Sequence, residues 1–112
     1  MKYMPMRTVE EIYKKAKRNE RTYVKQGCTY TAMYSKGKFE LIHYGAVIFG
    51  SDENTKKYYI GYKAYSATDR DSINSMMRIL DINQKYQMRK GEMIPMGPVE
   101  HSGWTVVKEG EI

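Results

Sequence analysis

The amino-acid sequence predicts an α+β fold, a small antiparallel sheet of three to four strands with two helices packed on it. Three patterns lead to this prediction: an amphipathic helical stretch near the N-terminus, alternating strand-like residues over 28–65, and a capped helical stretch from Thr68. The expected order of elements is α-β-β-β-α-β. A chain of 112 residues suits one domain, 1–112, with a single hydrophobic core.

The first helix is predicted to begin at Val9, because Thr8 and Glu11 match the capping box that satisfies free backbone N–H groups at a helix start. It is expected to end near Asn19. Residues 21–25 are expected to form a short strand or an extended lead-in. The apolar positions recur at the spacing of one helix face: Val9, Ile12, Tyr13 and Ala16.

Two strands are expected next, separated by a tight turn at Lys36-Gly37. The first, 28–35, alternates apolar and polar residues, as a strand with one buried face does. The second, 39–49, is largely apolar at both alternating sets of positions. This predicts one central strand that is covered on both faces for part of its length.

A third strand is expected over 58–65, after a polar turn cluster at 51–54. Gly61 within it is expected to mark a bulge or a close approach of two backbone segments. The three strands together predict an antiparallel meander.

The second helix is predicted from Thr68, with Ser66 or Thr68 as its N-cap. Asp69 and Asp71 fall in its first turn, where negative charge is favoured by the helix dipole. Its apolar stripe predicts burial on the sheet: Ile73, Met76, Met77, Ile79, Leu80 and Ile82.

The C-terminal part carries weaker patterns. Residues 84–103 include two prolines, several glycines and several methionines, so we expect an irregular packed arm there. Trp104 to Val107 are expected to form a last strand.

The composition bounds the class of partner. Nineteen basic against thirteen acidic residues give a net charge of +6, which favours nucleic acid, an acidic protein surface or anionic lipid, or simply keeps a small domain soluble. The single cysteine, Cys28, cannot form an intramolecular disulfide, so a reducing cytoplasm suits the chain. No apolar run approaches the roughly 20 residues of a membrane span. We therefore expect a soluble cytoplasmic protein with no membrane partner.

Catalysis, metal binding and a cofactor are not expected. The two histidines, His43 and His101, have no partner at zinc-ligand spacing, and His43 is expected to be half-buried and hydrogen-bonded. Cys28 and His43 would serve as nucleophile and base if they met, although a structural cysteine is the preferred interpretation. Asp69 and Asp71 would suit magnesium, but a helix start collects acidic residues for electrostatic reasons alone.

Two groups of side chains are candidates for binding. A basic cluster on the first helix would contact a polyanion or an acidic partner, or form an ordinary solvated helix end: Lys14, Lys15, Lys17, Arg18 and Arg21. Four tyrosines are predicted as interface aromatics that anchor a protein or stack on unpaired bases, although some of them must pack in the core: Tyr58, Tyr59, Tyr62 and Tyr65.

The order helix, three strands, helix resembles that of the double-stranded-RNA-binding domain. That family places a lysine-rich turn at the start of its second helix, where this chain has Asp69 and Asp71. Because carboxylates repel phosphates, double-stranded RNA is not expected as the specific ligand.

Two stretches, His43-Tyr44-Gly45 and the run AYSATDRDSIN from Ala64 to Asn74, resemble small uncharacterised phage-encoded proteins of Gram-positive bacteria. Small single-domain phage proteins in turn resemble anti-CRISPR and related anti-defence inhibitors. The resemblance implies a non-catalytic inhibitor whose partner is a host defence protein, such as a CRISPR effector nuclease or its guide-RNA complex. The alternative is a small basic nucleic-acid-binding module of phage origin, which would bind RNA or DNA.

Overall fold

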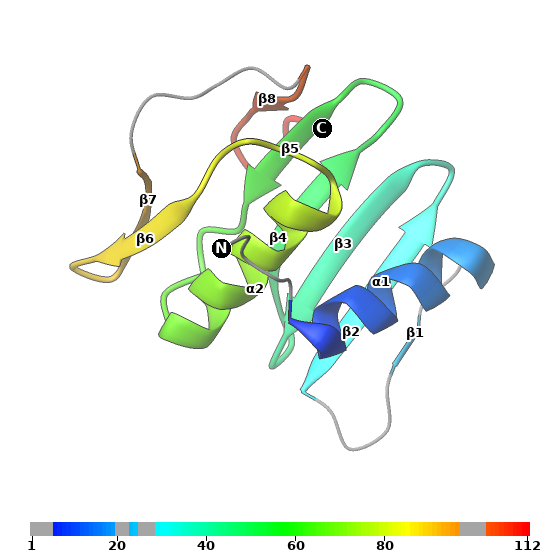
Figure 1. Ribbon diagram of the computed structural model, residues 1–112, viewed down its shortest axis with the longest axis horizontal. Helices are drawn as coiled ribbons and strands as arrows, with labels where there is room; N and C mark the ends of the chain where they lie inside the picture. Colours follow the sequence, from blue (N-terminus) through cyan, green and yellow to red (C-terminus); the bar gives the residue numbers. More distant parts are fainter. Residues whose placement is uncertain (1–5, 20–22, 25–28, 97–102) are drawn as a thin grey trace.

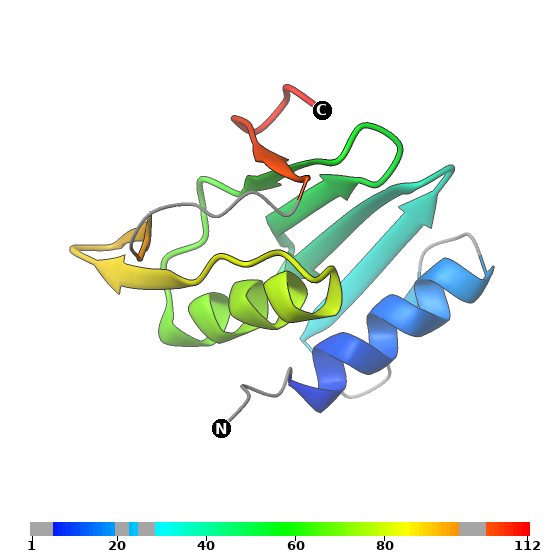
Figure 2. The same ribbon diagram turned by 45° about the horizontal axis from the view of Figure 1, so that its top comes forward.

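Two helices lie on one face of a six-stranded sheet, as Figure 1 and Figure 2 show. The helices are α1 (Arg7–Asn19) and α2 (Ala67–Ile79). The predicted α+β class, with two helices packed on a sheet, is confirmed. No helix in the described part of the chain is long and apolar enough to cross a membrane. The computed structural model describes residues 6–19, 23–24, 29–96 and 103–112.

The sheet is larger than predicted and of mixed direction. β1 to β5 form an antiparallel meander, and β8 adds to β5 in parallel. The predicted meander is therefore present with more strands, and the strand expected near the C-terminus joins the sheet at its edge. In spatial order the strands are β1 (Tyr23–Val24), β2 (Tyr30–Ser35), β3 (Lys38–His43), β4 (Ala46–Asp52), β5 (Lys57–Ile60) and β8 (Thr105–Val106).

The prediction of one central strand over 39–49 is wrong, because the chain reverses at Tyr44 and Gly45. Both residues have positive φ, 50° and 78°, the combination that two-residue hairpin turns use. The apolar stretch therefore forms two neighbouring strands, β3 and β4, with a register shift between Leu41 and Ile42. Both strands contribute to the core, which explains why the stretch is apolar throughout.

This extra turn also removes the likeness to the double-stranded-RNA-binding domain. Five strands, β1 to β5, separate α1 from α2, where that domain has three. The element order therefore gives no support to a function of that type.

The third predicted strand, 58–65, is shorter than expected and forms β5. The Gly61 amide donates a hydrogen bond to the Ile48 carbonyl over 2.8 Å, and a Cβ atom on Gly61 would lie 1.9 Å from the Val47 oxygen. The predicted close approach at Gly61 is confirmed. It holds the loop that follows, residues 62–66, next to the start of β4.

The prediction of an irregular arm over 84–103 is wrong for residues 86–95, which form two strands and their turn. β6 (Tyr86–Arg89) and β7 (Glu92–Pro95) pair as an antiparallel hairpin. Its turn, Lys90-Gly91, again has positive φ at both residues. Residues 97–102 lie outside the described part of the chain.

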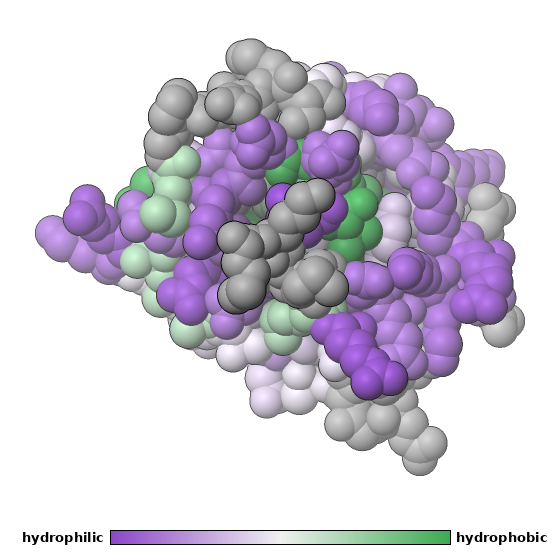
Figure 3. Space-filling model, in the orientation of Figure 1, coloured by the Kyte–Doolittle hydropathy of each residue, from purple (hydrophilic) through white to green (hydrophobic). Residues whose placement is uncertain are grey.

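The β6–β7 hairpin is fixed to α2 through the side chain of Asn74. Its Nδ2 donates to the backbone carbonyl of Tyr86 (3.0 Å), and its Oδ1 accepts from the backbone N–H of Tyr86 (2.7 Å). The Tyr86 hydroxyl also meets the Tyr58 hydroxyl at 3.0 Å. Figure 1 shows the hairpin extending away from the main sheet, and Figure 3 shows apolar side chains there beside a mostly hydrophilic helical face. The hairpin is therefore anchored at its base.

The two helix starts differ in how well local sequence predicts them. The Met6 carbonyl accepts from the Glu10 amide (3.0 Å), so α1 begins earlier than expected and Thr8 lies inside its first turn. The predicted cap at Thr8 is therefore wrong. In α2 the Ser66 hydroxyl accepts from the Asp69 amide and the Asp69 carboxylate accepts from the Ser66 amide, which confirms Ser66 as the cap.

The core lies between the helices and the sheet face that they cover. The predicted stripe of α2 is confirmed for Ile73, Met76 and Met77, which are buried, whereas Ile79 and Leu80 are partly buried. Other fully buried large side chains come from α1, β3, β4 and β5: Ile12, Phe39, Leu41, Ile48, Phe49 and Tyr58.

Candidate functional site

Three tyrosines are exposed on two connections that meet at one end of the sheet. Tyr44 in the β3–β4 turn is 78% exposed, and Tyr62 and Tyr65 in the β5–α2 loop are 78% and 66% exposed. Large aromatic rings gain much from burial, so exposing three of them together needs a reason. Tyr62 and Tyr65 belong to the four predicted interface aromatics, and Tyr44 does not.

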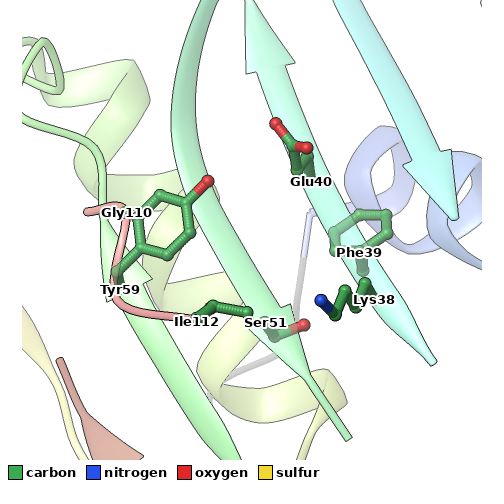
Figure 4. A pocket seen from close by; sticks show the side chains of 7 residues that line it. All are labelled: Lys38, Phe39, Glu40, Ser51, Tyr59, Gly110 and Ile112. Atoms are coloured by element: carbon green, nitrogen blue, oxygen red, sulfur yellow. The ribbon is translucent and has the colours of Figure 1, made fainter. Parts of the chain in front are cut away.

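The other two predicted interface aromatics do not project from the surface. Tyr58 is 1% exposed within the core, so it is wrong as a surface anchor, and burial raises the pKa of its hydroxyl. Tyr59 is 9% exposed and lies across β4 on the sheet face without helices (Figure 4). Burial, together with nearby Glu40 and Glu109, raises the pKa of Tyr59 to about 12, so this hydroxyl stays protonated at neutral pH.

A small hollow beside Tyr59 is the weaker of two candidate pockets. It has a volume of about 240 Å³ and lies over β3, β4 and β5, as Figure 4 shows. The opposite charges of Lys38 and Glu40 balance within its lining, and Gly110 and Ile112 of the chain's own C-terminal part border it. It therefore offers little net charge or exposed aromatic surface for recognition.

The stronger candidate lies between the β3–β4 turn and the start of α2. Its volume is about 310 Å³, at the lower end of the roughly 300–1,000 Å³ typical of ligand pockets. We call it the tyrosine-rimmed pocket. It is lined by His43, Tyr44, Ala46, Ile48, Lys63, Tyr65, Ser66, Thr68 and Asp69.

His43 lies at the base of this pocket in a fixed orientation. Its Nδ1 is 2.7 Å from Oδ1 of Asp69, and its ring stacks on Tyr30 with centroids 4.3 Å apart and planes 16° apart. The Tyr44 ring lies 4.6 Å away on a tilted plane. The contact with Asp69 confirms the predicted hydrogen bond. His43 is 7% exposed, so it is more deeply buried than the half-buried state expected.

Asp69 joins the helix cap to His43. One carboxylate oxygen accepts from His43, and the other accepts from the amides of Tyr65 and Ser66 at 3.2 Å each. Burial raises the pKa of Asp69, but the hydrogen bonds from His43, Tyr65 and Ser66 outweigh it and hold the pKa below its usual value. Asp69 is therefore ionised at neutral pH, with its charge satisfied by these donors.

Lys63 is the cationic side chain that lines the pocket. Its Nζ lies 5.7 Å from the centre of the Tyr62 ring, a distance at which a cation is attracted to an aromatic face. Because the Asp69 charge is internally satisfied, Lys63 sets the sign of charge that the pocket presents at its rim.

Tyr44 adopts a backbone conformation that is uncommon for tyrosine. Its φ is 50°, in the left-handed region that Asn, Asp and Gly adopt most readily at this turn position. The ring is exposed and contacts the buried His43 ring on one side. Lys36-Gly37 and Lys90-Gly91 have a similar pair of positive φ values, so this conformation is the one that the chain's two-residue turns use, and the pair Tyr44-Gly45 between two apolar runs is the sequence signal for this turn.

The His43–Asp69 pair resembles a general base with its orienting carboxylate, but no nucleophile completes it among the described residues. No hydroxyl or thiol there is hydrogen-bonded to His43, and the Ser66 hydroxyl is used in the helix cap. The predicted partner Cys28, and His101, lie outside the described residues. No group of three or more His, Cys, Asp or Glu side chains suited to a metal ion occurs within the described ranges.

The predicted basic cluster lies along α1, and its described lysines face carboxylates. The distances are 2.9 Å for Lys14 to Glu10, 3.4 Å for Lys15 to Glu11 and 3.3 Å for Lys17 to Glu53. Arg18 is exposed, and Arg21 lies outside the described residues. These exposed pairs are weak, yet they reduce the positive potential that a phosphate would meet at this helix.

Comparison of the chain with protein-family models, curated proteins and solved structures gives no match. The tyrosine-rimmed pocket is therefore a candidate site by its own geometry, and the likeness to phage proteins stays a prediction.

Proposed function

We propose that this protein is a non-catalytic, phage-encoded inhibitor of a bacterial defence nuclease, in the first place a CRISPR nuclease. It acts by binding the nuclease, or its guide-RNA complex, through the end of the sheet that carries Tyr44, Tyr62 and Tyr65. The observation that carries the proposal is that all three rings are exposed around Lys63, which lines one pocket with Tyr44 and Tyr65 and lies 5.7 Å from the centre of the Tyr62 ring.

Tyrosines support this function because they are common among the residues that dominate binding energy at protein interfaces. Each ring offers a large rigid surface with few rotatable bonds, and each hydroxyl supplies a polar contact.

Charge supports an acidic or polyanionic contact on the nuclease. The chain carries +6, so it does not imitate DNA, which would require an acidic surface. Long-range attraction would speed the encounter, and the aromatic contacts would then slow dissociation.

The decisive experiment is capture followed by inhibition. Tagged protein is incubated with a lysate of a host that carries CRISPR systems, beside a matched Tyr62→Ala/Tyr65→Ala variant whose fold is checked by circular dichroism. We expect the wild type to enrich a CRISPR effector that the variant does not. Titration of the purified effector should then abolish target cleavage at about one inhibitor per nuclease. Full cleavage in the presence of excess protein would contradict the proposal.

The non-catalytic part is tested separately. Purified protein is incubated with DNA and RNA in the presence of magnesium or manganese, together with His43→Ala and Asp69→Asn variants. We expect no turnover from any of the three. Turnover by the wild type that His43→Ala abolishes would make this protein an enzyme instead.

A further inference from the structure

The base of the tyrosine-rimmed pocket offers one free hydrogen-bonding atom. His43 uses Nδ1 for Asp69, and Nε2 has no partner among the described residues. Nε2 is also not one of the buried unpaired atoms of the described chain, and His43 lines the pocket, so Nε2 is the ring nitrogen that remains for a ligand there. Because a carboxylate accepts the proton on Nδ1, neutral His43 presents Nε2 as an acceptor. The pocket is therefore built to receive a donor such as an N–H group.

The charges favour a neutral group inside the pocket and an anion outside it. The carboxylate of Asp69 already takes the hydrogen bonds of His43, Tyr65 and Ser66, so a second carboxylate or a phosphate at that depth would lack a cation or donor to offset its burial. Lys63 lies on the loop at the rim and would attract an anion there. A ligand that fits has a neutral body linked to a negatively charged group.

The lining also favours a flat, partly apolar body. Tyr44 and Tyr65 offer exposed ring surface, while Ala46 and Ile48 form an apolar wall. Nucleobases are flat heterocycles that stack on tyrosine rings whatever the base, and their edges carry amino and imino N–H groups that can donate to Nε2.

We infer that the tyrosine-rimmed pocket binds one unpaired base of a single-stranded nucleic acid. The base stacks on Tyr44 and Tyr65 and directs an N–H toward His43, and an adjacent phosphate lies beside Lys63. The inference rests on the proposed function in using the same surface, because effector complexes guided by RNA expose single-stranded guide RNA or displaced DNA. A base in a duplex is excluded, since stacking neighbours cover both of its faces.

The test is fluorescence anisotropy with fluorescein-labelled single-stranded oligonucleotides of adenosine and of cytidine, as RNA and as DNA, at two salt concentrations. A labelled blunt duplex is the control ligand. We expect saturable binding of the single strands and much weaker binding of the duplex. Tyr65→Ala should weaken single-strand binding about tenfold, the typical effect of losing one stacking ring. Lys63→Gln should lower the salt dependence by about 0.7 in log–log slope, as expected for one phosphate contact on a single strand.

Two matched variants keep the result interpretable. Tyr44→Asn removes a ring at a turn position where Asn is favoured, so the fold is retained while binding weakens. Lys14→Gln/Lys17→Gln alters α1 instead and should leave single-strand affinity unchanged. Thermal melting monitored by circular dichroism verifies the fold of each variant.

Two outcomes would overturn the inference: no anisotropy change at low salt, or binding that the α1 variant abolishes while Tyr44→Asn and Tyr65→Ala leave it intact. The proposed function can fail independently. Inhibition of a nuclease without any oligonucleotide binding would remove this inference alone, and oligonucleotide binding through the pocket without nuclease inhibition would remove the proposed function alone.

Discussion

Replacing Asp69 by alanine tests how the candidate site is held in place. Asp69 is 5% exposed and connects β3, the β5–α2 loop and the first turn of α2 through hydrogen bonds to His43, Tyr65 and Ser66. The substitution leaves the buried Nδ1 of His43 without its acceptor and breaks the capping box. We therefore expect both a loss of stability and a loosened pocket.

The size of the effect follows from two separate contributions. Loss of the helix-capping contacts costs about 0.5–2 kcal/mol. Loss of a hydrogen bond to a charged group costs about 1.5–3 kcal/mol. Since these contributions involve different donors, the free energy of unfolding should fall by about 2–5 kcal/mol. A domain with a typical stability of about 5–15 kcal/mol would in most of this range remain folded.

Urea denaturation, followed by circular dichroism and by fluorescence of the single tryptophan, Trp104, measures this change. With a slope of about 2 kcal/mol per molar urea, the midpoint should fall by about 1–2.5 M. Asp71→Ala is the matched control, because Asp71 lies in the same helix turn and pairs with Arg70 at a half-exposed site. The control should lose less than about 1 kcal/mol. Equal losses in the two variants would refute the structural role assigned to Asp69.

Three further predictions concern stability. The pKa of Asp69 is lowered in the fold, so its ionised form stabilises the protein above the unfolded carboxyl pKa of about 3.9. This contribution is lost as the pH falls through the native pKa, so wild-type stability should drop more steeply than that of Asp69→Asn below about pH 5. Parallel pH curves for the two proteins would contradict this. Ile73→Ala should cost about 2–5 kcal/mol in urea unfolding, and Leu80→Ala, at a partly buried position, clearly less, so that equal costs would count against the packing described. Gly61→Ala should cost about 1–3 kcal/mol because its Cβ would displace the Val47 backbone, and an unchanged thermal midpoint would show that the approach is looser.

In α2 the sequence predicts the features that depend on neighbouring residues. The cap at Ser66 and the stripe of Ile73, Met76 and Met77 depend on residues within a few positions of one another. The split of 39–49 was missed because Tyr44 is an uncommon residue for its turn, and apolar residues flank it on both sides. The strand at Thr105–Val106 was expected, but its parallel pairing depends on where the chain returns to β5, which local patterns do not encode.

The candidate site shows the same division. Composition alone draws attention to Tyr62 and Tyr65, which are exposed. Tyr58 is buried among residues that are distant in sequence, including Phe49 and Tyr86, so strand periodicity could not separate it from its neighbours. The link between His43 and Asp69 joins positions 26 residues apart, and no spacing rule for metal or catalytic motifs covers it.

The most direct test of the central claim is the affinity of the captured defence nuclease for this protein with and without its exposed tyrosines. Isothermal titration calorimetry should compare the wild type with a Tyr44→Asn/Tyr62→Ala/Tyr65→Ala variant whose fold is verified by circular dichroism. Since interface hot spots contribute about 2 kcal/mol or more each, we predict that the variant binds at least about a hundredfold more weakly. A folded variant that binds with wild-type affinity would contradict the claim that this end of the sheet is the interaction surface.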